Sequence, residues 1–118
     1  MAKEIAKKIT TKTFFEKIAQ FENTVYQITM TNKFKKSIDL SYSRNLNLQL
    51  LLDVVELLAQ DKKLPEKYCA HELKGHYKGV WECHIKPDWL LMWEEDKKEL
   101  VLLLLNTATH SDFVGKKY

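Results

Sequence analysis

Residue types that mark several protein classes are scarce or missing in this chain of 118 residues. Its two cysteines, Cys69 and Cys83, are too few for a disulfide framework, and their spacing is not that of a paired-thiol metal motif. Three glycines and two prolines leave little room for a flexible linker. The longest apolar run, residues 100–105, is far too short to cross a bilayer, and the basic N-terminus lacks the apolar core of a signal peptide. These absences predict a cytoplasmic protein with no membrane association.

What remains is the composition of an ordinary globular domain. Hydrophobic residues make up 45% of the chain and charged residues 30%, and the length suits one compact domain with its own core. The net charge is +3 with neutral histidines. A positive charge favours a polyanionic partner because cationic side chains displace the counterions of phosphates, although many proteins without such partners share this balance.

The first sixty residues have mainly helical patterns. Residues 2–22 place isoleucines and phenylalanines among lysines, which predicts one or two amphipathic helices interrupted by threonines at residues 10–13. Residues 24–29 have strand character. Thr31 or Asn32 is suited to cap a helix that ends near Arg44, and a second helix over residues 48–60 follows a turn and a new cap within residues 45–47. The short join between these two helices predicts a helical hairpin.

The chain changes character after Pro65. Residues 77–85, 89–93 and 100–105 are strand-like runs rich in aromatic and aliphatic side chains, separated by polar turns at residues 86–88 and 95–98. Their close spacing predicts antiparallel pairing. The expected fold class is therefore α+β: a helical hairpin packed on one face of a small antiparallel sheet, with an extra N-terminal helical segment.

All the histidines lie in this second half; they are His71, His76, His84 and His110. Strand alternation places His84 on one face with Glu82, and the turn at Pro87 is expected to bring Asp88 close to His84. His110 directly follows the third strand, and His71 lies in the loop before the first. These strand ends and this loop are expected to converge on one site, whereas His76 has the features of a loop residue outside it.

Such a set suits metal-free cleavage of RNA. The ribose 2′-hydroxyl must lose a proton as it attacks the neighbouring phosphorus, and the leaving 5′-oxygen must gain one. Imidazole, with an unperturbed pKa of about 6.5, can do either near neutral pH. Cations offset the charge that grows on the phosphate oxygens, and the nearby lysines are Lys74, Lys78 and Lys86. This chemistry needs no cofactor and no metal.

Simpler interpretations compete with this one. A single histidine in a strand is usually a surface or core residue, and an aspartate such as Asp88 is common after proline in turns. Trp89 and Trp93 fall on the opposite alternation phase and are expected in the core. A zinc site is a further alternative, but the spacing of its candidate ligands matches no closed tetrahedral pattern; these ligands are Cys69, His71, Cys83 and His84.

Several short motifs are more specific than any single residue. They read LPEKY at residues 64–68, HELKG at 71–75, YKG at 77–79, ECHIKPDWLL at 82–91 and THSD at 109–112. Together they resemble the YafQ branch of the RelE/ParE toxin superfamily. The likeness covers residues 25–115, and the string CHIKPDWLL is its most specific part.

This resemblance implies an mRNA interferase toxin of a type II toxin–antitoxin system. Such a toxin is an endoribonuclease that cleaves messenger RNA, often on the ribosome, and a cognate antitoxin neutralises it. The family's catalytic residues, carried over by motif, fall on His71, His84, Asp88 and His110. We expect His110 to protonate the leaving oxygen and His71 with Asp88 to act near the 2′-hydroxyl. His84 would hold the phosphate or orient a partner.

The chain also departs from the family pattern. Members usually carry an arginine where this chain has Trp81 and another where it has Asn106. A guanidinium can bind phosphate through two parallel hydrogen bonds, which neither replacement can form. The sequence therefore predicts an endoribonuclease of reduced activity, and the pair of substitutions Trp81→Arg and Asn106→Arg is expected to raise it.

Residues 1–24 lie outside the resemblance. We expect them to form an N-terminal helical extension on a toxin domain of residues 25–118, with an ordered helix packed on that domain. One hypothesis is that this helix occupies part of the apolar groove in which an antitoxin helix binds.

Two other functions fit the same fold. A relative that has lost catalysis would survive as an antitoxin-binding protein or transcriptional co-repressor, and the missing arginines favour this alternative. A ParE-like toxin directed at DNA gyrase is less consistent with the histidines, because that activity needs no proton shuttle. The retained histidines and Asp88 favour the ribonuclease.

Overall fold

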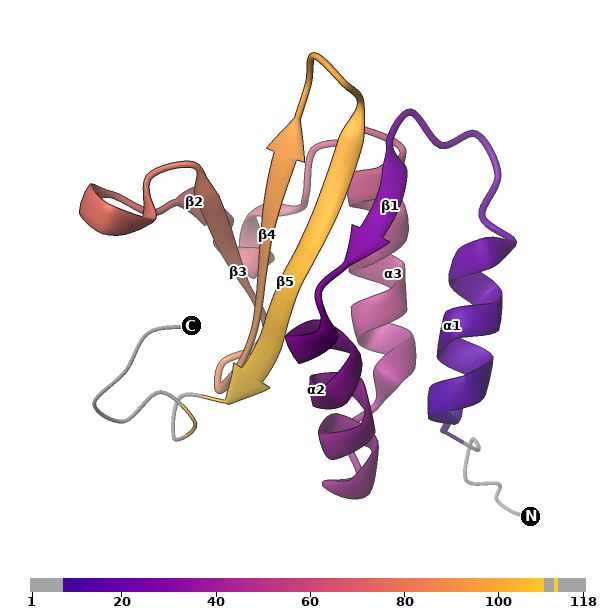
Figure 1. Cartoon of the computed structure of the whole chain (residues 1–118). Helices are drawn as coiled ribbons and strands as arrows, with labels where there is room; N and C mark the ends of the chain where they lie inside the picture. The colour runs from indigo at the N-terminus through magenta and orange to yellow at the C-terminus, as the bar shows by residue number, and fades with distance from the viewer. Residues whose placement is uncertain (1–7, 110–111, 113–118) are drawn as a thin grey trace.

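The computed structural model describes residues 8–109 and residue 112. These residues form a layer of helices against a five-stranded sheet (Figure 1). The helices are α1 (Thr11–Ala19), α2 (Asn32–Ser43) and α3 (Leu48–Ala59). The strands are β1 (Gln27–Met30), β2 (His71–Glu72), β3 (Val80–Lys86), β4 (Trp89–Asp96) and β5 (Val101–Thr109), and the short 3₁₀ helices η1 (Glu66–Tyr68) and η2 (Gly75–Tyr77) flank β2. The expected α+β fold class is confirmed.

Side-chain caps fix where each helix begins. The side-chain oxygens of Thr10, Thr31 and Asn47 each accept a hydrogen bond from a backbone N–H of the first turn, at 3.0–3.1 Å. The caps at Thr31 and Asn47 confirm the predicted starts of α2 and α3. The threonines at residues 10–13 were expected to interrupt a helix, but α1 begins there, because Thr10 caps it. No helix in the described part of the chain is both long and apolar enough to cross a membrane.

The strands lie in the order β1-β5-β4-β3-β2. The predicted antiparallel pairing holds for β3 with β4 and for β4 with β5. At the other edge β1 runs parallel to β5, so the sheet is mixed and the expectation of a wholly antiparallel sheet is wrong there. A parallel pair needs a long connection, and here α2, α3 and the other strands supply it. The strand predicted from residue 77 begins later, at Val80, because Gly75 and Gly79 turn the chain with φ of +70° and +95°.

The sheet has one face under the helices and one face on the opposite side. The main core lies between the helices and the sheet and includes Trp89 and Trp93, as the alternation predicted. A smaller cluster on the opposite face contains Val80, Leu90 and Met92, all at most 8% exposed. The opposite face therefore combines a few buried apolar side chains with the polar side chains of β3.

Helix α1 is part of the main core. The Phe14 side chain is fully buried, and its ring centroid lies 6.4 Å from that of Phe34 on α2. Ile18, one turn further along α1, is also buried. The expected ordered helix packed on the domain is confirmed for residues 11–19, while a domain boundary near residue 24 stays a prediction.

We expect Phe14→Ala to lower the free energy of unfolding by about 3–5 kcal/mol, the usual cost of emptying a buried phenylalanine site. Lys17→Ala, at an exposed position of the same helix, should change it by about 0.5 kcal/mol or less. Urea denaturation of both variants measures the difference. A loss of less than about 1 kcal/mol in Phe14→Ala would show that α1 is an appendage outside the core.

Candidate catalytic site

His71 and Glu82 face each other across the first strand pair. They are direct partners in the β2–β3 register, so their side chains leave the sheet on the same side. The His71 Nε2 atom lies 3.5 Å from Oε1 of Glu82, a carboxylate whose side chain is only 9% exposed. His71 Nδ1 lies 2.9 Å from the carbonyl oxygen of Cys69. The carboxylate and the carbonyl together fix the orientation of an imidazole that is otherwise exposed.

His84 lies two residues beyond Glu82 on β3 and therefore on the same face. Its imidazole is half-buried, and Nδ1 lies 3.3 Å from the carbonyl oxygen of Pro87 in the turn to β4. Asp88 is the next residue of that turn and is exposed. The predicted proximity of His84 to this turn is thus confirmed, and one peptide unit separates the contacted carbonyl from Asp88.

The end of β5 reaches the same end of the sheet. Thr109, the last residue of β5, pairs with Trp89, which directly follows Asp88. His110 comes next in the chain but lies outside the described residues, so its predicted place in the site is not addressed. The described part of the site consists of His71, Glu82, His84 and Asp88, with the end of β5 beside Asp88.

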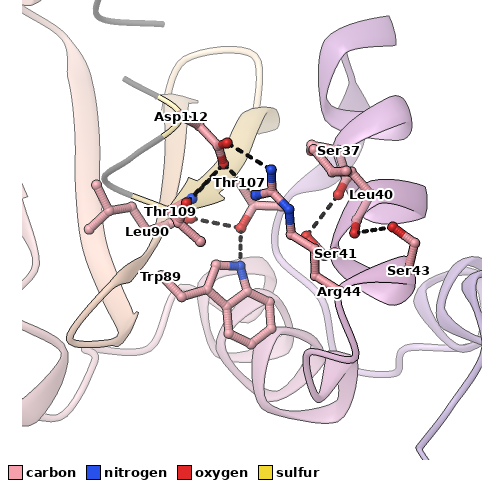
Figure 2. A network of polar contacts seen from close by, with 10 residues as sticks. All are labelled: Ser37, Leu40, Ser41, Ser43, Arg44, Trp89, Leu90, Thr107, Thr109 and Asp112. Atoms are coloured by element: carbon pink, nitrogen blue, oxygen red, sulfur yellow. Dashed lines mark hydrogen bonds and ion pairs between the residues drawn. The ribbon is translucent and has the colours of Figure 1, made fainter. Parts of the chain in front are cut away.

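A buried hydrogen-bond chain joins β4 to β5 at this end (Figure 2). The Trp89 indole Nε1–H donates to the Thr107 hydroxyl at 2.8 Å, and that hydroxyl donates to the Leu90 carbonyl at 2.7 Å. Trp89 and Thr107 are at most 2% exposed. Because a buried polar group left without a partner is costly, this chain holds the two strand ends in register.

A second polar contact ties residue 112 to the end of α2. Arg44 Nη1 and Nη2 donate to the two carboxylate oxygens of Asp112 at 2.8 and 3.0 Å, and Thr109 donates to the same carboxylate (Figure 2). The hydrogen bonds from Arg44 are the main reason why the pKa of Asp112 falls from 3.8 to about 2. A folded-state pKa below the unfolded value means that the stabilisation is present above about pH 4 and is lost as the pH falls towards 2.

The candidate lysines do not lie together. Lys86 lines a groove of about 540 Å³ beside His84, together with Lys67, Tyr68 and Pro87. Lys78 lies at the other end of β3 and lines a different groove with the acidic β4–β5 turn. Lys74 precedes η2, near the start of β3. Of the predicted phosphate-binding lysines, Lys86 is thus the one next to His84.

The two positions at which family arginines are missing lie on opposite faces of the sheet. Trp81 is on the helix-covered face, where its ring stacks on that of Trp93 at 6.2 Å. Asn106 pairs with Met92, which in turn pairs with Glu82, so it lies on the histidine face. An arginine at position 106 would lie in the same row as Glu82 and His71, whereas one at position 81 would point away from them.

The cysteines argue against the zinc alternative. Cys83 alternates with His84, so its thiol points into the main core, where burial raises its pKa to about 12. Cys69 is exposed and lies beside the histidine face. The four proposed zinc ligands are therefore divided between two faces, and no group of three or more potential metal ligands occurs among the described residues.

Two features of this region have no local signal in the sequence. Glu82 was noted beside the histidines without a role, and only the β2–β3 register reveals it as the partner of His71. The Arg44–Asp112 pair joins residues 68 positions apart. Neither contact follows from spacing, because both depend on how distant segments pack.

Comparison with known proteins identifies relatives over most of the chain. A family model described as "Bacterial toxin of type II toxin-antitoxin system, YafQ" matches residues 26–115. The mRNA interferase toxin YafQ of Escherichia coli strain K12 is 29% identical over 89 residues, which cover 75% of this chain and 95% of that protein.

Solved structures agree with this match. YafQ in the E. coli DinJ-YafQ toxin-antitoxin complex has a TM-score of 0.69 and 27% identity, and the match covers 75% of this chain and 96% of that one. A metal-bound toxin from Helicobacter pylori has a TM-score of 0.69 and 38% identity, with coverage of 74% and 97%. The matched residues begin after α1, so the family model does not include this helix.

We expect the two thiols to react very differently with an alkylating reagent at pH 8. Exposed Cys69 should be labelled in the native protein, whereas Cys83 is buried and only about one in ten thousand of its thiols is ionised when the pKa is about 12. Mass spectrometry should find one label on the native protein and two in urea. Rapid double labelling of the native protein would contradict the placement of Cys83 in the core.

Proposed function

The chain belongs to the YafQ family of toxins from bacterial type II toxin–antitoxin systems, and we propose on this basis that it is an mRNA interferase that cuts RNA by histidine acid–base chemistry. Relatives that match three quarters of the chain are named mRNA interferases. The observation that carries the proposal is the clustering of His71, Glu82 and His84 on one face of the sheet, next to Asp88 and the end of β5.

The proposed reaction uses these groups in two proton transfers. His71, oriented by Glu82, takes the proton from the ribose 2′-hydroxyl while the oxygen attacks the adjacent phosphorus. The bond from phosphorus to the 5′-oxygen breaks, and His110 gives that oxygen a proton. The products are a 2′,3′-cyclic phosphate and a free 5′-hydroxyl. His84 and Asp88 lie between these two groups and orient the phosphate.

The groove beside His84 suits an RNA chain. Lys67 and Lys86 line it with two ammonium groups, and Tyr68 contributes an aromatic ring. Base stacking on aromatic rings and phosphate contacts with cations are the usual means of holding single-stranded RNA. We therefore assign Lys86 to the phosphate backbone near the cut, and Lys74 and Lys78 to more distant parts of the message.

A protein antitoxin is the second expected partner. The matched E. coli toxin was solved in complex with its antitoxin DinJ, and we propose an equivalent partner for this chain. Because Phe14 and Ile18 attach α1 to the core, the hypothesis that α1 occupies part of the antitoxin groove concerns a fixed helix. Cleavage on the ribosome and cytoplasmic location are further parts of the proposal.

The alternative functions have less support. Trp81 packs on the face away from the histidines, so the loss of an arginine there is weak evidence for a catalytically inert co-repressor. Asn106 does lie on the histidine face, which agrees with reduced activity rather than none. The names of the relatives give no support to gyrase as the target.

We expect His84→Ala to lower the rate of cleavage of translated messages by about 100-fold or more, the usual contribution of a positioned acid–base group. His110→Ala should have an effect of the same order. His76→Ala is the matched control, because His76 is exposed in η2 and lies outside the proposed site. If wild-type protein cuts no message, or if His76→Ala loses as much activity as His84→Ala, the proposed chemistry is wrong.

We expect Asn106→Arg to raise cleavage by about tenfold, because the guanidinium would stabilise the charge that grows on the phosphate. Trp81→Arg should give no gain, since position 81 faces the helices. Both rates should be compared at matched folded fractions, because each substitution changes a buried or half-buried side chain. A gain from Trp81→Arg alone would contradict the assignment of the two faces.

A further inference from the structure

We propose that Arg44 and Asp112 form a clamp that holds the turn at residues 109–112 on the end of α2 and so positions the general acid of the site. The inference rests on the proposed ribonuclease function and on the role of His110 in it. His110 follows Thr109 and precedes Asp112 by two residues in the chain, and both bracketing residues are described. Arg44 and Asp112 are positioning residues under this proposal, and neither contacts the RNA.

The carboxylate of Asp112 closes the turn at both ends. It accepts hydrogen bonds from the Thr109 backbone N–H at 2.9 Å and from the Thr109 hydroxyl at 3.1 Å. The sequence spacing is that of a capping box, in which an acidic side chain bonds the N–H three residues before it. A four-residue segment whose ends share one carboxylate leaves its two inner residues little freedom of backbone direction.

Arg44 ties this closed turn to the helical layer. It caps the C-terminus of α2, where its backbone N–H donates to the Leu40 carbonyl at 3.0 Å, and a cation is favoured there by the helix dipole. The Arg44 guanidinium extends from this fixed point and holds both oxygens of Asp112 (Figure 2). The other end of the turn is held by Thr109 in β5. The turn is therefore attached to α2 and to the sheet at once.

The residue type at position 44 is informative. Arg44 is the only arginine among the 19 basic residues of the chain. A guanidinium binds a carboxylate through two parallel hydrogen bonds, whereas a lysine ammonium acts as a point charge. Because both nitrogens of the fork already bond Asp112, Arg44 is better suited to fixing the direction of this carboxylate than to binding phosphate.

An exposed ion pair changes global stability little, so the effect is expected in the rate. Arg44→Ala and Asp112→Asn should each lower the maximal rate of message cleavage about tenfold, with the enzyme concentration at half-maximal rate unchanged. Arg44→Lys should lie between them and wild type. The melting temperature should fall by about 4 °C or less. Asp39→Asn and Lys36→Ala, at exposed positions of α2, are matched controls and should keep the wild-type rate.

The double variant Arg44→Ala/Asp112→Asn separates a clamp from two independent contacts. If the residues act through each other, the double variant is no slower than either single variant. Rate losses that multiply would overturn the clamp. A raised half-maximal concentration in Arg44→Ala together with a wild-type rate in Asp112→Asn would overturn it as well, because Arg44 would then contact the RNA directly.

Amide ¹⁵N relaxation tests the clamp without any cleavage. In wild type the order parameters of residues 109–112 should be near 0.85, and in Asp112→Asn and Arg44→Ala they should fall below about 0.6, with no change in the two controls. Unchanged order parameters would overturn the clamp whatever the rates. If wild type cuts no message but the order parameters fall as expected, the clamp stands and the ribonuclease proposal fails.

Discussion

The whole site depends on the alternation of side chains along β3, one face of which is covered by the helices. Cys83 and Ile85 enter the main core, so Glu82 and His84 must leave the sheet on the other side. A slip of one residue would bury both polar side chains and expose both apolar ones, and the cost of such an exchange fixes the register. The hydrophobic core thus determines which face of the sheet carries the imidazoles.

This constraint reaches the rest of the site through strand pairing. The β2–β3 register sets His71 opposite Glu82, and the β4–β5 register brings Thr109 to the turn that contains Asp88. The chain of hydrogen bonds from Trp89 through Thr107 to the Leu90 carbonyl lies directly beneath that turn. Residues from β2, β3, the β3–β4 turn and the end of β5 are therefore positioned by backbone register rather than by local loop structure.

Sequence patterns could predict what depends on neighbouring residues. The caps at Thr31 and Asn47, the burial of Trp89 and Trp93, and the face of His84 all follow from short-range chemistry or strand alternation. The same alternation already places Trp81 on the face away from His84.

Contacts between distant segments left no such signal. The parallel pairing of β1 with β5, the two-residue strand β2 and the fork from Arg44 to Asp112 join residues far apart in the chain. Each arises only once the helices have packed on the sheet. The conserved-looking motifs could identify the family, but they could not show that Glu82 orients His71 or that α1 completes the core.

The central claim is that RNA binds on the sheet face that carries His71 and His84, at the end where the β3–β4 turn meets β5. The most direct measurement is the change in backbone amide NMR shifts when the protein binds an RNA that carries a 2′-deoxyribose at the cleavage position. We expect the largest changes in β2, in the second half of β3 and in the turn at residues 87–88. Changes confined to α1 and α3, on the helical side of the molecule, would contradict the account.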